Sequence, residues 1–213
     1  MNCIFSIRKQ YSDLIFDKIK PIEFRNKLPK IEKGDKIYVY ETKNKGCGMV
    51  IGYFVVKETR EIPHNKIGTY IYMDLYAKMF CDEETQNQIN KAKKINLNGY
   101  DNSLVLSCLF RDDCLNEMME THLPPSNFIP MNSQQIKEFN DIKKKQDNFC
   151  SNCDTWLTKI GFYNEYDESL WKYEILIDDV VRFKTPIPIT NFKLQNGNYL
   201  KRAPQSFCYI QEG

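Results

Sequence analysis

The chain has 213 residues, of which 42% are hydrophobic and 13% aromatic, and its formal net charge is +2. This length suits one domain, or one domain with a large insertion, and the composition excludes an intrinsically disordered chain. No run approaches the roughly 18 apolar residues of a membrane span, and charge comes too early at the amino terminus for a signal peptide. We therefore predict a cytoplasmic protein with no membrane partner.

The first 60 residues predict the order β-α-β-β-β. Apolar residues alternate over 3–7, as in a strand, and recur at helical spacing over 11–19, where a helix ends before Pro21. Three further strands are predicted, at 22–25, 36–41 and 49–57. Gly52 lies inside the last of these and indicates a bulge or a barrel corner.

The middle of the chain has a different character, because polar helical patterns replace the strands. Helices are predicted at 82–94, 112–121 and 133–145. The last has a capping-box-like start, with Asn132 followed by Gln135. We interpret residues 74–165 as a helical insertion.

Strand character returns after the insertion. It is predicted at 173–177 and 180–183, and Pro186 and Pro188 are expected to end it. A final strand is predicted at 206–210, and it should pair with a strand from the first 60 residues if both parts of the chain form one barrel.

The small net charge hides an uneven distribution along the chain. Residues 1–66 contain 14 Lys and Arg against 8 Asp and Glu, a balance of +6, whereas the remainder has a balance of −4. A basic first part favours an anionic partner. Ordinary solvated loop lysines explain the same pattern, so charge alone does not decide between the two.

The segment 17–25 contains the most informative group of charges. Side chains alternate along a strand, so Glu23 and Arg25 share one side while Ile22 and Phe24 face a core, and the preceding helix delivers Lys20. Such a group suits a ligand that has donors together with phosphate or carbonyl acceptors. The alternatives are structural: Lys20 complements the helix dipole, and Glu23 forms an ion pair that only fixes the barrel.

Two motifs in the right order resemble those of the ASCH domains in the PUA-like superfamily. They are the Lys-x-x-Glu-x-Arg pattern of Lys20, Glu23 and Arg25, and the ending Pro-Gln-Ser-Phe at 204–207. The resemblance covers about residues 1–66 and 172–212. It implies an α+β fold, a PUA-like (ASCH) bent β-barrel with a flanking helix, here one domain over 1–213 with the helical insertion.

The family resemblance also implies a cleft into which the motif residues point. PUA-like folds mostly bind RNA or modified bases, and some small ASCH proteins are amidohydrolases on acetylated cytidine or have been regarded as ribonucleases. In the amidohydrolase type a threonine nucleophile follows the lysine by three residues. This chain has Glu23 there, and Pro21 removes another hydroxyl, which favours binding over catalysis.

The eight cysteines do not form a recognisable zinc pattern. Cys150 and Cys153 have the spacing of half a site, but no second pair or histidine spacing matches it, so we predict neither metal nor cofactor. A site that adds Cys108 and Cys114 is the alternative. Without a secretion signal, we expect reduced thiols.

The function predicted from the sequence is binding of RNA or a nucleotide-like ligand through a basic cleft. The ligand-binding candidates are Lys20, Glu23, Arg25, Tyr40, Glu41 and Arg8. The alternatives are an enzyme, either a ribonuclease or a nucleoside amidohydrolase with Lys20 and Glu23 as catalytic residues, and a protein-interaction module built from the insertion. The sequence does not indicate an oligomeric state.

Overall fold

The computed structural model describes residues 1–62, 67–97, 133–163 and 171–211, together with positions 114, 116, 119 and 120. The chain divides into two units. Unit 1 combines Met1–Ile62 with Ile160–Gly213, and unit 2 is Pro63–Lys159. That they make one domain, a barrel of 1–66 and 172–212 with an insertion at 74–165, stays a prediction.

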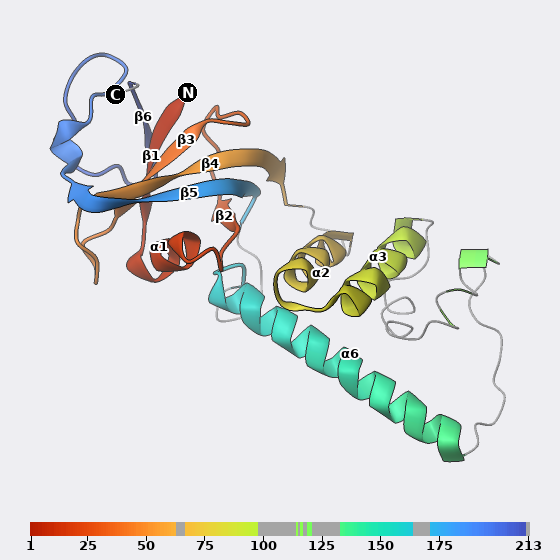
Figure 1. Ribbon diagram of the computed structural model, residues 1–213. Helices are drawn as coiled ribbons and strands as arrows, with labels where there is room; N and C mark the ends of the chain where they lie inside the picture. The colour runs from red at the N-terminus through yellow and green to blue at the C-terminus, as the bar shows by residue number, and fades with distance from the viewer. Residues whose placement is uncertain are drawn as a thin grey trace. The chain divides into compact units, whose positions relative to one another are not determined.

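Unit 1 is built on a single curled sheet of six strands (Figure 1). In chain order the strands are β1 (Asn2–Ile7), β2 (Ile22–Arg25), β3 (Lys36–Glu41), β4 (Val50–Glu61), β5 (Tyr173–Ile187) and β6 (Phe207–Ile210). Their order in the sheet is β2-β5-β4-β3-β1-β6, with β1 parallel to β3 and the other neighbours antiparallel. β6 pairs with β1, which confirms the predicted pairing of the last strand with one from the first 60 residues.

Helix α1 (Lys9–Phe16) connects β1 to β2 and packs against β3 and β5 on one side of the sheet (Figure 1). It ends in a tight turn, where Lys18 has a left-handed φ of 59° and the backbone N–H groups of Ile19 and Lys20 both donate to the carbonyl of Leu14. This turn delivers Lys20 directly to the start of β2.

Strand alternation sorts the apolar residues of unit 1 into two cores. Phe5, Val39 and Phe54 belong to the core that also contains Ile15 of α1. Their strand neighbours Ile4 and Tyr40 belong to a second core, which is completed by residues of the C-terminal segment, among them Ile189, Leu200 and Ile210. The α1 side and the C-terminal side of the sheet are therefore both buried, as the nearly continuous apolar run in β4 requires.

The predicted α+β class with a bent sheet and a flanking helix is confirmed. The predicted break at Pro186 is wrong, because β5 is continuous from Tyr173 to Ile187. β2 pairs only with residues 173–176 of β5, so β2 is not beside β5 at Pro186. A proline is tolerated there because the strand needs no backbone N–H donor on that side. The pairing of β4 with both β3 and β5 changes register between Val50 and Gly52, which confirms the predicted bulge.

Unit 2 contains the helices α2 (Ile67–Phe80), α3 (Glu83–Leu97) and α6 (Ser133–Lys159). The sequence did not predict α2, since its apolar residues surround the whole helix and leave no clear helical period. α6 is 27 residues long and extends well beyond the predicted end at 145. Most of the helix predicted at 112–121 lies outside the described residues, which include only positions 114, 116, 119 and 120 of it. Asn132 also lies outside the described residues.

Aromatic packing joins α2 to α6. The ring of Tyr76 lies 5.6 Å from that of Phe149 and 5.7 Å from that of Trp156, and Phe80 lies 6.2 Å from Trp156. No helix within the described ranges has both the length and the apolar character needed to cross a membrane.

Candidate ligand-binding site

Lys20 is buried at the start of β2, with an exposed fraction of 3%. Its ammonium donates to the carbonyl oxygen of Ile160 and lies 4.5 Å from the ring centre of Phe24. Burial lowers the pKa of Lys20 to about 8, with the charge of Arg25 acting in the same direction and Glu23 opposing it. Lys20 is therefore a desolvated cation held in a largely apolar setting.

Glu23 bridges the two cations of the motif. One carboxylate oxygen lies 2.8 Å from a terminal nitrogen of Arg25, and the other lies 3.6 Å from the ammonium of Lys20. The Arg25 guanidinium lies 4.5 Å from the ring centre of Phe5 and donates to the carbonyl of Ser6, whereas its buried Nε has no hydrogen-bond partner. Within the described part of the chain, the cluster thus holds two cations against one carboxylate.

Ion pairs bring the side chains of Lys20, Glu23 and Arg25 together, and all three are largely withdrawn from solvent. The side chains of Lys20, Glu23 and Arg25 are only 3%, 8% and 11% exposed. β2 is the terminal strand of the sheet, and Ile160 and Phe162 contact Lys20 and Phe24 of this segment. The assignment of a ligand to these residues stays a prediction.

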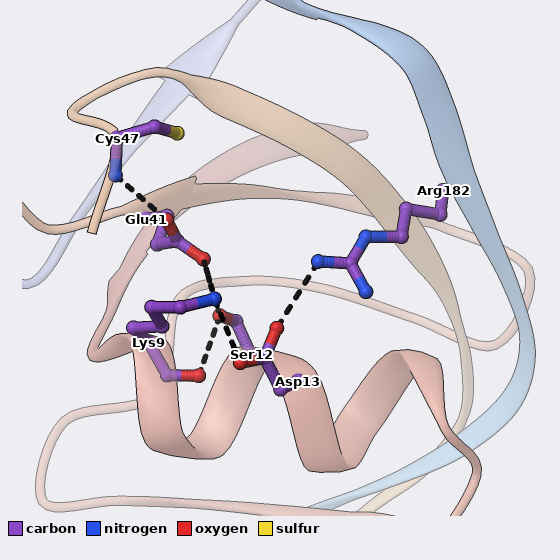
Figure 2. A network of polar contacts seen from close by, with 6 residues as sticks. All are labelled: Lys9, Ser12, Asp13, Glu41, Cys47 and Arg182. Carbon is purple, nitrogen blue, oxygen red and sulfur yellow. Dashed lines mark hydrogen bonds and ion pairs between the residues drawn. The ribbon is translucent and has the colours of Figure 1, made fainter. Parts of the chain in front are cut away.

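Glu41 is buried at the end of β3 and belongs to a separate polar network (Figure 2). Its carboxylate accepts a hydrogen bond from the Ser12 hydroxyl of α1 (3.2 Å) and one from the backbone N–H of Cys47 (2.7 Å). Lys9 lies 3.9 Å from the same carboxylate. Glu41 therefore fastens the β3–β4 loop to the helix, and its contacts account for its burial without a ligand.

The same network continues to the surface through Asp13 (Figure 2). Asp13 accepts from Lys9 (2.8 Å) and from Arg182 of β5 (3.0 Å). Partial burial opposes ionisation, but these two bonds prevail and hold the pKa of Asp13 below its usual value. The contact between Asp13 and Arg182 joins α1 to β5, whereas the contact between Lys9 and Asp13 lies within the helix.

Tyr40 lies away from the motif cluster, whereas Arg8 follows two residues after Ser6, whose carbonyl accepts a hydrogen bond from Arg25. Tyr40 is 5% exposed and packs in the second core, on the opposite side of the sheet from Phe5, against which Arg25 stacks. Arg8 is exposed and its carbonyl accepts the first backbone bonds of α1. Strand alternation predicts this separation for Tyr40, since Val39 and Tyr40 face opposite sides.

Ser12, Asp13 and Arg182, which complete the Glu41 network, were not among the site residues predicted from the sequence. No local pattern connects them, because Arg182 is 169 residues from Asp13. Lys201 and Arg202 were not predicted either. The composition of residues 180–211, with five Lys and Arg and no Asp or Glu, could have indicated a basic segment there.

The cysteines differ in one respect from the expectation of reduced thiols. Cys3, Cys47, Cys81, Cys150, Cys153 and Cys208 are free, but Cys114 is disulfide-bonded, with a partner outside the described residues. Burial raises the pKa of Cys150 to about 11 and of Cys153 to about 12. Over the described residues, no three His, Cys, Asp or Glu side chains are grouped to hold a metal ion.

Comparison with known proteins gives matches among solved structures. No protein-family model and no curated protein matches the chain. The ASCH protein of Zymomonas mobilis matches with 13% identity over 99% of this chain and 88% of that chain, at a TM-score of 0.41. A tyrosine-to-phenylalanine variant and a serine-to-alanine variant of that protein match with 12% identity, also at a TM-score of 0.41.

These solved structures have the ASCH name that the Lys20, Glu23 and Arg25 motif led us to expect. Likeness at this level carries no argument about a ligand or a reaction. The functional argument therefore rests on the residues of this chain.

Proposed function

We propose that the chain binds RNA or a nucleotide-like ligand through the cluster of Lys20, Glu23 and Arg25. Phosphate or carbonyl oxygens of the ligand accept hydrogen bonds from Arg25 and Lys20, and an amino group of a base donates to Glu23. Guanidinium and ammonium groups are the usual protein partners of such oxygens.

The observation that carries this proposal is the charge imbalance in a nearly dry site. Among the residues that the structure describes, two largely buried cations lie with one carboxylate, and the Nε–H of Arg25 lacks an acceptor. A buried charge or donor without a partner is costly, whereas an anionic or acceptor group from a ligand removes that cost. An acceptor-rich ligand is thus the missing complement of the cluster.

The test is binding of a nucleoside monophosphate and of an eight-nucleotide single-stranded RNA to Arg25→Lys. This substitution keeps the charge but removes the planar fork, so we expect at least a tenfold loss of affinity for both probes, in line with about 1.5–3 kcal/mol for a hydrogen bond to a charged group. Arg60→Lys is the matched control, because Arg60 lies 2.7 Å from the buried Glu174 in a comparable pair.

Melting temperatures of both variants show whether they are folded. Unchanged affinity in folded Arg25→Lys, or no binding of either probe by the wild-type chain, would overturn the proposal.

One observation also favours the catalytic alternative. A lysine whose pKa is lowered to about 8 is better suited to proton transfer near neutral pH than an ordinary lysine. The corresponding test incubates the wild-type chain with RNA and with N-acetylated cytidine. Product formation that Lys20→Arg and Glu23→Gln abolish, while melting curves show both variants to be folded at the assay temperature, would replace the binding proposal by a hydrolase.

A further inference from the structure

The C-terminal segment of unit 1 forms a short hairpin that is well anchored. Lys193 and Tyr199 face each other in an antiparallel bridge, and the N–H of Leu194 donates to the carbonyl of Asn198. Gly197 has a φ of +84°, which suits glycine in such a tight turn. Leu194 and Leu200 pack in the second core, so the hairpin has a defined position on the sheet.

Tyr199 projects from this anchored hairpin and remains 56% exposed. The ammonium of Lys193 lies 5.0 Å from the centre of its ring and covers one face. Tyr199 lines two hollows at once, of about 960 Å³ and about 400 Å³. An aromatic ring between two hollows offers a flat surface on which a planar group can stack.

The charged residues that the structure describes on the hairpin of Tyr199 and in the two hollows are all positive. Lys193, Lys201 and Arg202 are exposed, and the last two line the larger hollow with Tyr199. Residues 180–211 as a whole contain five cations and no carboxylate side chain. Since the whole chain is nearly neutral, this segment has a local positive field that attracts anions.

We infer that the surface formed by Lys193, Tyr199, Lys201 and Arg202 binds single-stranded nucleic acid. A base stacks on the open face of Tyr199, and the flanking phosphates contact Lys201 and Arg202. Stacking on aromatic rings combined with cations along the backbone is how proteins bind single strands without reading their sequence. A duplex does not fit, because its bases are already stacked on one another.

This inference extends the proposed function to a second surface, on the side of the sheet opposite to Arg25. The two differ in what they need from a ligand. The motif cluster requires an acceptor group that a mononucleotide already supplies, whereas the Tyr199 surface requires a base and its neighbouring phosphates together. Mononucleotides and oligonucleotides therefore separate the two sites experimentally.

The experiment measures binding of three probes to the full chain: an eight-nucleotide RNA, an abasic oligonucleotide with the same number of phosphates, and a nucleoside monophosphate. Tyr199→Ala should weaken RNA binding by roughly 5- to 150-fold for one stacked base, and Tyr199→Phe should retain it. The wild-type chain should bind the abasic probe about as weakly as Tyr199→Ala binds RNA. Mononucleotide binding should not change in either variant.

A second pair of variants tests the phosphate contacts. Lys201→Gln/Arg202→Gln should reduce the slope of log affinity against log salt by about 1.4, at about 0.7 per contact on a single strand. Lys143→Gln/Lys144→Gln removes two exposed charges from α6 and should leave the slope unchanged.

Three results would overturn the inference: no RNA binding by the wild-type chain, equal binding of RNA and the abasic probe, or unchanged RNA binding by Tyr199→Ala. Equal binding of the two oligonucleotides would indicate a site for anionic partners in general, such as an acidic peptide. If Arg25→Lys has no effect while Tyr199→Ala weakens RNA binding, the motif cluster is not a ligand site and the Tyr199 surface remains one.

Discussion

Lys20 is an unusual residue in this molecule, since an ammonium group is almost never fully buried without a full set of partners. Its burial links protonation to folding. The folded state holds the pKa at about 8, whereas the unfolded chain restores the ordinary value of 10.5. Between these pH values the unfolded state binds more protons, so the cost of the buried charge is fully present below pH 8 and disappears as the pH rises toward 10.5.

We predict that the stability of the wild-type chain relative to Lys20→Met increases between pH 7 and pH 10. The pKa difference corresponds to about 3 kcal/mol at the most. Urea unfolding of both chains at pH 7, 8, 9 and 10 measures it, and the comparison cancels the other groups that titrate in this range. Parallel pH profiles would show that Lys20 is ordinarily solvated.

Glu23 is the only carboxylate that ion-pairs with Lys20 or Arg25 in the part of the chain that the structure describes. We predict that Glu23→Gln destabilises the fold by about 3–5 kcal/mol, because it leaves two buried cations without a counter-charge. Chemical denaturation of Glu58→Gln provides the control: Glu58 is 55% exposed and 4.0 Å from Arg60, so its loss should cost less than about 1 kcal/mol. Equal effects of the two substitutions would contradict the prediction.

Strand β4 crosses close to both its neighbour β5 and helix α1 at Gly52. A Cβ atom at this position would lie 2.2 Å from the carbonyl oxygen of Val181 and 2.8 Å from the ring of Phe16. The backbone of a paired strand cannot move aside as a flexible side chain does. The bulge at Gly52 is therefore a requirement of the packing between sheet and helix, and not only of the curl of the sheet.

Gly52→Ala is accordingly expected to destabilise the chain by at least about 1–3 kcal/mol, the cost of overpacking in a core. Gly34→Ala is a suitable comparison, since nothing lies within 4 Å of its Cβ position and only its φ of +91° opposes the substitution, which costs about 1–2 kcal/mol. Denaturant midpoints of the two variants measure the difference. A smaller effect at Gly52 than at Gly34 would mean that β4 and β5 separate easily.

Over the described residues, the six strands and the two apolar cores of the sheet belong to unit 1, whereas the elements described in unit 2 are helices. The two chain segments of unit 1 also contact each other where the first one ends, since the N–H of Ile62 donates to the carbonyl of Lys172. The partner of Lys20, the Ile160 carbonyl, lies in unit 1 as well. The elements that the sheet and the motif cluster need are thus present without residues 63–159.

We predict that a chain in which a flexible linker on the order of ten residues replaces residues 63–159 folds cooperatively and keeps its β-sheet signal. Circular dichroism and urea unfolding would measure this. A loss of near-ultraviolet signal together with dye binding by exposed apolar surface would show instead that unit 1 depends on unit 2.

The pattern of hydrophobic residues determined much of this fold. Alternation and turn residues located all six strands and α1, because these are local signals, and the spacing of Lys20, Glu23 and Arg25 placed the three side chains together at one strand entry. α2 was missed because a helix with apolar residues on all its faces shows no helical period of hydrophobicity. α6 was predicted to end too early, at 145.

Only the tertiary structure decided how exposed the candidate residues are. Burial of Lys20 depends on Phe24 and on the Ile160 carbonyl, which is 140 residues away, and no sequence pattern expresses such a contact. The separation of Tyr40 from Arg25 follows from which side of the curled sheet each strand residue faces. Likewise, the Tyr199 surface depends on packing within unit 1. The buried Leu200 and the partly buried Leu194 anchor the hairpin, and the hairpin holds the ring of Tyr199 in solvent among cations.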